Sequence, residues 1–265
     1  MSAAETIDPR QAQIWREDWP PGRPFARTWA PYVHAQTIVA GRVLDVGCGM
    51  GEGIALLSRR ADFAVGMDAS PQRVRDAPDY NRGAPVHWCA GSAEALPFAP
   101  ASFDTVVCSH VLEHLSDQPR AVRELRRALA PHGQLLLATP NAAQSPGPYP
   151  PHRHELRADE LRALLSAEFA EVEMLPVEGT ELMLRRRELM QETARPWLRL
   201  DVLRLRERLP QAWREWLFHR LQPRLRRQVQ AQMPSTKAPE DGFIVGDGDL
   251  AQAFDFFCIC RGGRR

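Results

Sequence analysis

The sequence predicts an α/β fold, a doubly wound, mostly parallel sheet of seven strands with a helical cap inserted between strands six and seven. Three observations predict it. Short β-like apolar runs alternate with longer helical patterns between residues 41 and about 140, a glycine-rich turn directly follows the first run, and an arginine-rich helical block separates the last two runs. Alternation of this kind is typical of parallel strands joined by crossover helices.

Residues 1–40 are predicted to form an N-terminal lid or packing arm. The stretch IWREDWPPGRPFARTWAPY carries three tryptophans and is interrupted by prolines, which disfavour one continuous helix. No apolar window approaches the roughly 18 residues of a membrane span, and the N-terminus has no basic region followed by an apolar one. We therefore expect a cytoplasmic protein.

Residues 41–179 are predicted to form the core domain. GRVLDVGCG is a strand that ends in the glycine turn, and GIALLSRRA is the helix after it. Further strands are predicted at FAVGMDAS, PVHWCAGS, SFDTVVCSH and GQLLLATPN, and a sixth at AEVEMLPV after the helix RADELRALLSAEF. In such sheets, ligands bind beyond the carboxyl ends of the strands.

Residues 180–250 are predicted to form the basic helical cap, and residues 251–265 the last core strand and a tail. Between residues 180 and 233 there are 13 arginines and 6 acidic residues, although the whole chain has a formal net charge of +1. Leucine and tryptophan recur there at helical spacing, which predicts amphipathic helices broken near Pro196, Pro210 and Pro223.

Acidic residues flank the glycine turn in a pattern that predicts its ligand. Asp68 follows the second strand, where a carboxylate can accept hydrogen bonds from both hydroxyls of a ribose. Asp45, just before the turn, suits a cationic amino group. Glu52 places a negative charge where a pyrophosphate would lie, which disfavours a dinucleotide. An ordinary tight turn, with Gly47, Gly49 and Gly51 serving the backbone alone, is the alternative.

These residues resemble the class I S-adenosylmethionine-dependent methyltransferases over residues 41 to about 175. VLDVGCGMGEG is similar to the first motif of that family, and GMDAS to the acidic end of its second strand. AGSAEALPFAPASFDTVVCSHVLEHL is similar to its adenine-side loop and fourth strand, and AVRELRRALAPHGQLLLATPN to its next helix and fifth strand.

The resemblance implies S-adenosylmethionine as the cofactor and assigns its contacts. The backbone of Gly47, Cys48 and Gly49 would contact its methionine part, and Gly51 would complete the cofactor-binding turn. Asp45 would lie near the amino group and Asp68 would bind the ribose.

The adenine contacts follow from the same resemblance. Ala69 would pack against the ring, and Ser92 and Ala93 would lie at its edge. The family commonly has aspartate where this chain has Ser92, so we expect a hydrogen bond without charge assistance and a lower cofactor affinity.

The string HVLEH after the fourth strand also matches the His-x-x-Glu-His motif of inverted zinc peptidases. A peptidase would carry this motif on a long helix, so we reject that interpretation. For Glu113, helix-start electrostatics is the simplest role. His110 or His114 could act as a general base. In a subset of the family, a similar Glu-x-x-Glu-His segment and a later histidine hold a divalent metal. This chain has His110 in place of the first glutamate, so a metal is not favoured.

Two more histidines, His152 and His154, follow the fifth strand in PYPPHRHEL. They are either exposed loop residues or acceptor-binding groups. The candidate catalytic residues are therefore His110, His114 and His154, and no metal ligand is assigned. Because proton removal is needed when the acceptor is a hydroxyl, the histidines favour O-methylation.

The predicted function is methyl transfer from S-adenosylmethionine to a hydroxyl of a sugar or glycan-related acceptor, either small or lipid-linked. A small-molecule O- or N-methyltransferase of secondary metabolism is one alternative, and a non-catalytic binding scaffold is another. Residues 180–233 could be a solvated face, bind an anionic acceptor, or contact an anionic membrane peripherally. Nucleic acid is not favoured as a partner because the rest of the chain is acidic, and the sequence predicts no oligomeric state.

Overall fold

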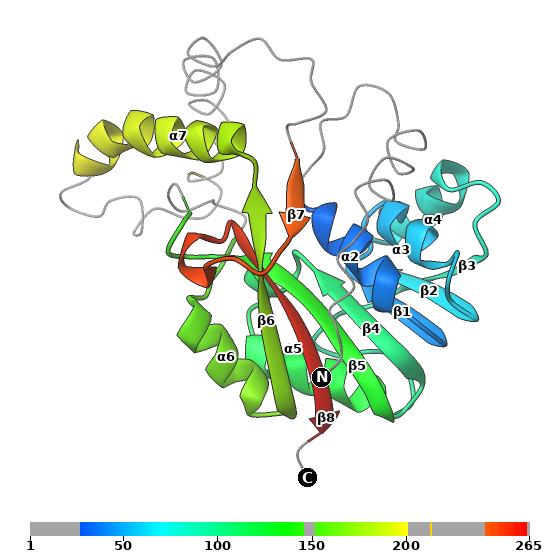
Figure 1. Ribbon diagram of the computed structural model, residues 1–265. Helices are drawn as coiled ribbons and strands as arrows, with labels where there is room; N and C mark the ends of the chain where they lie inside the picture. Colours follow the sequence, from blue (N-terminus) through cyan, green and yellow to red (C-terminus); the bar gives the residue numbers. More distant parts are fainter. Residues whose placement is uncertain (1–26, 146–151, 201–212, 214–241, 264–265) are drawn as a thin grey trace.

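The computed structural model describes residues 27–145, 152–200, 213 and 242–263 (Figure 1). Within this part of the chain, one sheet of eight strands has the order β3-β2-β1-β4-β5-β8-β6-β7. The strands are β1 Arg42–Val46, β2 Phe63–Asp68, β3 Val86–Ala90, β4 Phe103–Ser109, β5 Leu129–Pro140, β6 Phe169–Gly179, β7 Phe243–Val245 and β8 Asp255–Gly263. Strands β1 to β5 pair in parallel, whereas β8 and β7 pair antiparallel with their neighbours. The predicted α/β fold with a doubly wound, mostly parallel sheet is confirmed.

The sheet has eight strands rather than the predicted seven. The additional strand, β7, pairs with the end of β6 at Val177–Gly179 and lies in the stretch predicted to be helical cap. Three residues are too few to produce a recognisable alternation in the sequence. The predicted seventh strand is β8, which lies between β5 and β6 and runs antiparallel to both.

Helices cover both faces of the sheet and bury two apolar clusters (Figure 1). The helices α2 (Ala30–Ile38) and α3 (Glu52–Leu57) pack on one face, and α5 (Gln118–Ala128) and α6 (Ala158–Ser166) pack on the other. A fifth helix, α4 (Pro71–Tyr80), lies beside β2 and β3.

Two of these helices begin at capping residues. The Ser70 side chain accepts a hydrogen bond from the Arg73 amide, and Asp117 accepts one from Arg120, in each case with a proline in the first helical turn. Side-chain caps of this kind satisfy amide groups that have no partner within the helix.

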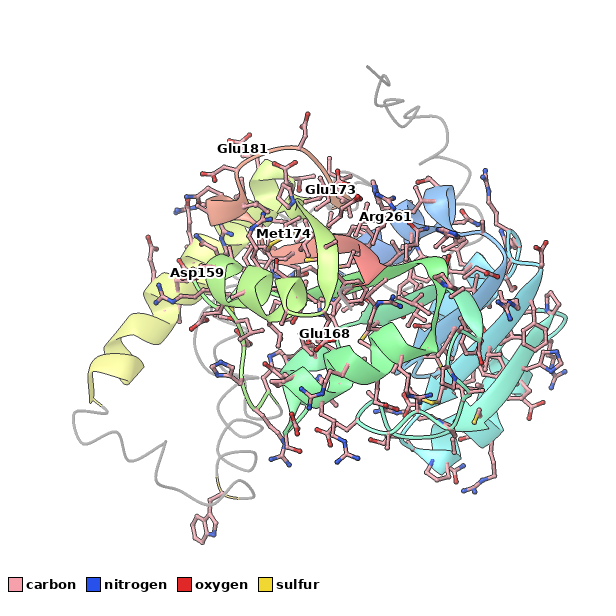
Figure 2. All side chains as sticks on the ribbon, turned by 90° about the horizontal axis from the view of Figure 1, so that it is seen from below. Asp159, Glu168, Glu173, Met174, Glu181 and Arg261 are labelled. Carbon is pink, nitrogen blue, oxygen red and sulfur yellow. The ribbon has the colours of Figure 1, made fainter. Side chains whose placement is uncertain are left out.

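Part of β6 faces solvent. Its exposed Glu173 precedes the buried Met174, and the exposed Arg261 lies on the neighbouring β8 (Figure 2). Because successive strand residues face opposite sides of the sheet, this alternation made β6 predictable as a strand.

The described part of the predicted cap is mainly the helix α7, Glu181–Leu200. This helix continues through position 196, so the predicted break near Pro196 is wrong. Proline has a helix-compatible φ and removes only one amide donor, so the neighbouring turns can continue. The predicted breaks at Pro210 and Pro223 lie outside the described residues, as do residues 1–26 of the predicted arm. No helix in the described ranges is both long enough and apolar enough to cross a membrane.

Candidate active site

The strand order reverses between β1 and β4, and the predicted site residues gather at this switch point. Strands β2 and β3 extend the sheet beyond β1, whereas β5 and the later strands extend it beyond β4. The loops that leave the carboxyl ends of β1 and β4 therefore diverge, which creates a ligand-binding crevice in sheets of this type. The glycine turn directly follows β1, and His110 directly follows β4.

The three glycines of the turn differ in what surrounds them. Gly47 has a φ of +77°, and a Cβ added there would lie 2.2 Å from Cγ2 of Val111. Gly51 has a φ of +86°, and its added Cβ would lie 2.2 Å from the Trp88 ring. Gly49 has a φ of +60°, and an added Cβ would meet no described atom within 4 Å. Gly47 and Gly51 thus permit close packing, whereas Gly49 borders open space that a ligand could use.

Asp45 is a fully buried carboxylate on β1, and Tyr32 of α2 contacts it. The Tyr32 hydroxyl lies 3.1 Å from both carboxylate oxygens and donates to them. Gly53 makes room for the Tyr32 ring, since an added Cβ there would lie 2.3 Å from it. Burial raises the pKa of Asp45 to about 7, and the Tyr32 hydrogen bond opposes this rise. A ligand ammonium group would supply the positive charge that this carboxylate needs.

Asp68 is at the carboxyl end of β2, and backbone amide groups fix its position. Its Oδ2 accepts a hydrogen bond from the Gly49 amide at 2.9 Å, and its Oδ1 accepts one from the Ser70 amide at 2.8 Å. Nη1 of Arg73 lies 3.7 Å from Oδ2 of Asp68. The carboxylate that was predicted to hold the ribose is therefore held directly against Gly49.

The predicted adenine-side residues lie on two neighbouring loops. Ala69 and Ser92 are exposed, and Ala93 is buried. The Ser92 hydroxyl accepts a hydrogen bond from the Glu94 amide at 3.2 Å. Glu94 in turn accepts hydrogen bonds from the amides of Ser116 and Asp117 at 2.9 and 2.8 Å, which tie this loop to the start of α5.

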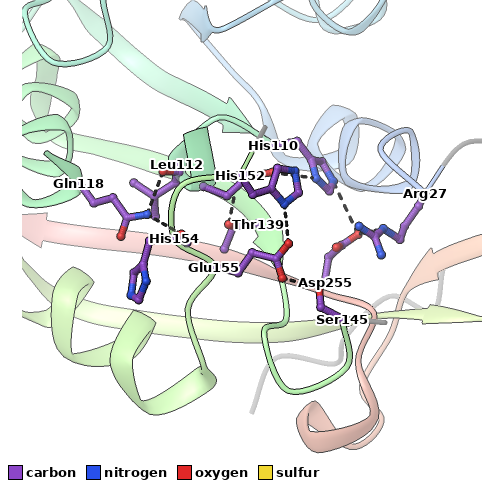
Figure 3. A network of polar contacts seen from close by, with 11 residues as sticks. Arg27, His110, Leu112, Gln118, Thr139, Ser145, His152, His154, Glu155 and Asp255 are labelled. Atoms are coloured by element: carbon purple, nitrogen blue, oxygen red, sulfur yellow. Dashed lines mark hydrogen bonds and ion pairs between the residues drawn. The ribbon is translucent and has the colours of Figure 1, made fainter. Parts of the chain in front are cut away.

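Directly after β4, His110 lies between two buried carboxylates (Figure 3). Its φ of +54° is uncommon for a residue other than glycine, and its amide donates to the Ala138 carbonyl at 2.9 Å. Its Nδ1 lies 3.4 Å from Glu113 Oε1, and its Nε2 lies 3.6 Å from Asp255 Oδ2. Asp255 also forms an ion pair with Arg27 at 3.0 Å.

Glu113 and Asp255 stabilise the charged form of His110. Burial alone would lower the pKa of His110, but the two carboxylates outweigh burial and raise it. Burial opposes ionisation of Glu113, yet the His110 ring holds the pKa of this carboxyl below its usual range. For Asp255, burial is the larger effect and raises the pKa. Glu113 lies in the first turn of the 3-10 helix η1 (Leu112–His114), as its predicted helix-start role requires, and it is also the centre of a buried network.

The loop after β5 and the residues before α6 complete the network (Figure 3). His152 Nδ1 lies 2.5 Å from Glu155 Oε1, and the other Glu155 oxygen accepts a hydrogen bond from the Ser145 hydroxyl. Burial opposes ionisation of Glu155, but the hydrogen bonds from His152 and Ser145 hold its pKa below the usual range. His152 Nε2 also lies 4.0 Å from Glu113 Oε1.

Three histidines were predicted to be catalytic. His110 is part of this network and His114 lies beside it, whereas the ring of His154 does not approach it. The ring centroids of His114 and His152 are 4.8 Å apart in an edge-to-face arrangement. The exposed ring of His154 points away, and its backbone carbonyl accepts a hydrogen bond from Gln118 (Figure 3). The Glu113 carbonyl accepts hydrogen bonds from the amides of Arg153 and His154, which fixes this backbone and turns His152 inward.

Glu113, His114 and His152 each place one potential metal-ligating atom within 4.8 Å of the others. Tetrahedral zinc ligands, at about 2.0–2.2 Å from the ion, lie roughly 3.4 Å apart. The 4.0 Å between Glu113 Oε1 and His152 Nε2 is wider than this. The segment also forms the 3-10 helix η1, Leu112–His114, rather than the long helix of a zinc peptidase. The arrangement agrees with an acid–base network better than with a closed metal site.

Sequence reasoning missed four of the residues that surround the crevice, namely Arg27, Tyr32, Glu155 and Asp255. Each lies outside the motifs that follow β1, β2 and β4. Asp255 had the clearest signal, because it is a charged residue at the start of the apolar run FDFFCIC. An acidic residue entering a buried strand usually has a specific partner.

In a comparison with known protein families, residues 44–137 match a family described as a methyltransferase domain. A probable S-adenosylmethionine-dependent methyltransferase of Mycobacterium tuberculosis is 39% identical over 146 residues, covering 53% of each chain. A ubiquinone biosynthesis O-methyltransferase of Xanthomonas euvesicatoria is 37% identical over 114 residues, covering 42% of this chain and 48% of that protein. The chain thus spans about half the length of these relatives.

The fold is also found in solved structures. The crystal structure of an S-adenosylmethionine-dependent methyltransferase of Thermotoga maritima, described as a possible histamine N-methyltransferase, superposes with a TM-score of 0.56. It covers 95% of this chain and 96% of that one at 15% identity, so the similarity concerns the fold.

Proposed function

We propose that the protein, whose residues 44–137 match a methyltransferase domain family, is a class I S-adenosylmethionine-dependent methyltransferase that methylates a hydroxyl group of a small or lipid-linked, sugar- or glycan-related acceptor. One observation carries the cofactor assignment: the buried carboxylates Asp45 and Asp68 flank Gly49, the glycine that borders open space. A cofactor with both an ammonium group and a ribose matches these two carboxylates.

When bound, S-adenosylmethionine supplies a methyl group already activated on a sulfonium. The residues of this chain then act mainly by binding and orientation. Asp45 would pair with the ammonium group, Asp68 would accept the ribose hydroxyls, and the Ser92 hydroxyl would reach the adenine edge. Aligning the acceptor with the methyl group supplies a large share of the rate enhancement in such displacements.

The acceptor assignment is supported by the network of His110, Glu113, His152, Glu155 and Asp255. Carboxylates and imidazoles accept hydrogen bonds from hydroxyl groups, and an imidazole can also take up the proton that O-methylation releases. The similarity to a ubiquinone biosynthesis O-methyltransferase favours transfer to oxygen, and a small-molecule O- or N-methyltransferase of secondary metabolism is the alternative. An N-methyltransferase would need no base for an amine that is already neutral.

The basic segment 180–233 is proposed to approach the acceptor or an anionic membrane surface. Sedimentation with vesicles of neutral and anionic lipids tests the membrane contact. Binding to anionic vesicles that weakens with salt is expected, and no co-sedimentation at low salt would remove the membrane from this proposal.

The first experiment is calorimetric titration with S-adenosylhomocysteine, the reaction product that would occupy the same cofactor site. We expect one binding site in the unaltered protein and a severe loss of affinity in Asp68→Asn. Asp62→Asn is the matched control, since Asp62 is an exposed carboxylate before β2. If the unaltered protein, free of co-purified ligand, does not bind, a non-catalytic scaffold replaces the enzyme.

The acceptor is then sought with methyl-labelled S-adenosylmethionine. Nucleotide sugars and glycolipids form the first panel, and catechols and primary amines form the second. Label transfer to the second panel alone would replace the glycan assignment by a small-molecule O- or N-methyltransferase.

A further inference from the structure

One short segment of the chain covers two buried carboxylates that belong to different halves of the site. This strap, residues 27–33, leads into and includes the first turn of α2. Nε of Arg27 lies 3.0 Å from Oδ2 of Asp255, and the Tyr32 hydroxyl lies 3.1 Å from both oxygens of Asp45. Asp45 is on β1 and Asp255 begins β8, and β4 and β5 lie between these strands in the sheet. The strap therefore bridges the cofactor side and the acceptor side.

Hydrogen bonds make the strap one unit and separate it from the rest of α2. The Trp29 carbonyl accepts a hydrogen bond from the Tyr32 amide at 3.0 Å, which joins Tyr32 to the turn that contains Arg27. Farther along α2, the buried Gln36 side chain donates to the Leu56 carbonyl of α3 at 3.1 Å. The second half of α2 is thus fixed to α3. A displacement of Tyr32 is expected to carry Arg27 with it and to leave Gln36 in place.

On the cofactor side, the strap blocks direct contact with Asp45. The Asp45 side chain has no exposed surface, and the Tyr32 ring packs against Gly53, where an added Cβ would lie 2.3 Å from the ring. Burial raises the pKa of Tyr32 well above its usual range, so its neutral hydroxyl gives Asp45 hydrogen bonds but no positive charge. A ligand ammonium group would compensate the carboxylate better, and direct contact requires Tyr32 to move aside.

On the acceptor side, Asp255 is covered but not satisfied. Its side chain is fully buried, and neither oxygen accepts a hydrogen bond in the described part of the chain. Arg27 and His110 both approach Oδ2, at 3.0 and 3.6 Å (Figure 3). Burial raises the pKa of Asp255, and these two cations oppose only part of the rise. A buried carboxylate with unused acceptor capacity usually receives hydrogen bonds from water or from a ligand.

We propose that the strap couples the two halves of the site. Tyr32 gives up its place on Asp45 to the ammonium group of the cofactor, and the displaced strap withdraws Arg27 from Asp255. The uncovered Asp255 then accepts hydrogen bonds from hydroxyl groups of the acceptor, so the cofactor binds before the acceptor. Arg27 is a positioning residue, and Asp255 belongs to the acceptor-binding site. This inference rests on the proposed O-methylation with S-adenosylmethionine.

The sign of the coupling distinguishes a strap from a direct contact. A closed strap competes with the ligand, so the apparent affinity is reduced by the fraction of molecules in which the strap is open. A substitution that releases Arg27 from Asp255 should therefore tighten cofactor binding. Loss of a residue that merely supports the cofactor site would weaken it.

The test is calorimetric titration with S-adenosylhomocysteine at pH 8, where Asp45 is mostly ionised. This ligand has no net charge, so a changed charge at position 27 has little direct effect on it. Arg27→Gln and Asp255→Asn should each tighten binding about fivefold or more. The double variant should bind no tighter than either single variant, because both substitutions break the same ion pair.

Two further variants serve as controls. Arg27→Lys keeps the cation and should bind with nearly the affinity of the unaltered protein. Arg42→Gln breaks an ion pair of similar length, 3.1 Å to Asp104, at the opposite end of β1, and should leave the affinity unchanged. Melting temperatures identify a variant that fails to fold, and Arg27→Gln decides alone if Asp255→Asn is such a variant.

Unchanged or weaker binding in a folded Arg27→Gln variant, or additive effects in the double variant, would overturn the strap. Absence of binding in the unaltered protein is a different result, since it removes the proposed function itself. With an acceptor from the panels, Asp255→Asn should raise the KM for that acceptor about tenfold or more at saturating S-adenosylmethionine, whereas Arg27→Gln should not raise it. An unchanged KM in Asp255→Asn would remove Asp255 from the acceptor-binding site.

Discussion

The affinity for S-adenosylhomocysteine is predicted to fall about eightfold between pH 7.5 and pH 6, because a bound ammonium group requires Asp45 in its ionised form. Asp45 is fully buried, and burial raises its pKa from 3.8 to about 7. The carboxyl therefore gains a proton as the pH falls through about 7, and ligand binding must then expel it. Relative to the protein with Asp45 fully ionised, the affinity is lower by about 11-fold at pH 6 and by about 1.3-fold at pH 7.5. The two binding free energies therefore differ by roughly 1.2 kcal/mol.

Calorimetry measures this effect directly. Titrations at pH 6 in two buffers with different ionisation enthalpies should show the release of nearly one proton per bound ligand. Asp45→Asn is the decisive control, because it keeps every histidine and removes only the carboxyl that titrates. Its affinity should be low but nearly independent of pH over this range. An unaltered protein with equal affinity at both pH values, or an Asp45→Asn variant with the same pH dependence, would refute the reasoning.

Three new substitutions, and the stability of Asp45→Asn, test the neighbouring structure. Tyr32→Phe removes a hydrogen bond that lowers the pKa of Asp45, so the midpoint of the pH dependence should move upward in the same titration. Asp45→Asn should raise the free energy of unfolding of the ligand-free protein at pH 8 by up to roughly 4 kcal/mol. The raised pKa of Asp45 in the folded state means that the carboxyl stabilises the fold at low pH, and that this contribution is lost as the pH rises through about 7. Asparagine stays neutral and does not lose it. Gly49→Ala should cost roughly 1–2 kcal/mol in urea unfolding because a φ of +60° is strained for alanine, and it should also weaken S-adenosylhomocysteine binding because the added Cβ enters space in which no described atom lies within 4 Å. Gly51→Ala should cost about 1–3 kcal/mol in urea unfolding because the added Cβ meets the Trp88 ring.

The cofactor half of the site was largely predictable because its residues follow the ends of adjacent strands. Once β1 and β2 are recognised as parallel neighbours, Asp45 and Asp68 must approach the glycine turn between them. In the structure the Gly49 amide donates a hydrogen bond to Asp68, whereas binding of a cofactor by the two carboxylates stays a prediction. The glycines share a sequence pattern but differ in role, since Val111, which follows β4, packs against Gly47, and Trp88 of β3 packs against Gly51.

The network of histidines and carboxylates that follows β4 was predictable only in part. The string HVLEH identified His110 and Glu113, but their carboxylate and imidazole partners come from distant stretches of the chain. Spacing alone could not distinguish His152 from His154 either, since two hydrogen bonds to the Glu113 carbonyl decide which ring turns inward.

The sequence by itself determined the α/β class, the parallel core, the glycine turn and the two cofactor-side carboxylates, because strand periodicity and strand-end residues are local properties of the chain. The tertiary structure decided that β8 lies antiparallel between β5 and β6, which brings Asp255 to His110. It also decided which buried charges compensate one another. Protonation depends on burial and on neighbours contributed by separate elements, and neither exists until the chain has folded.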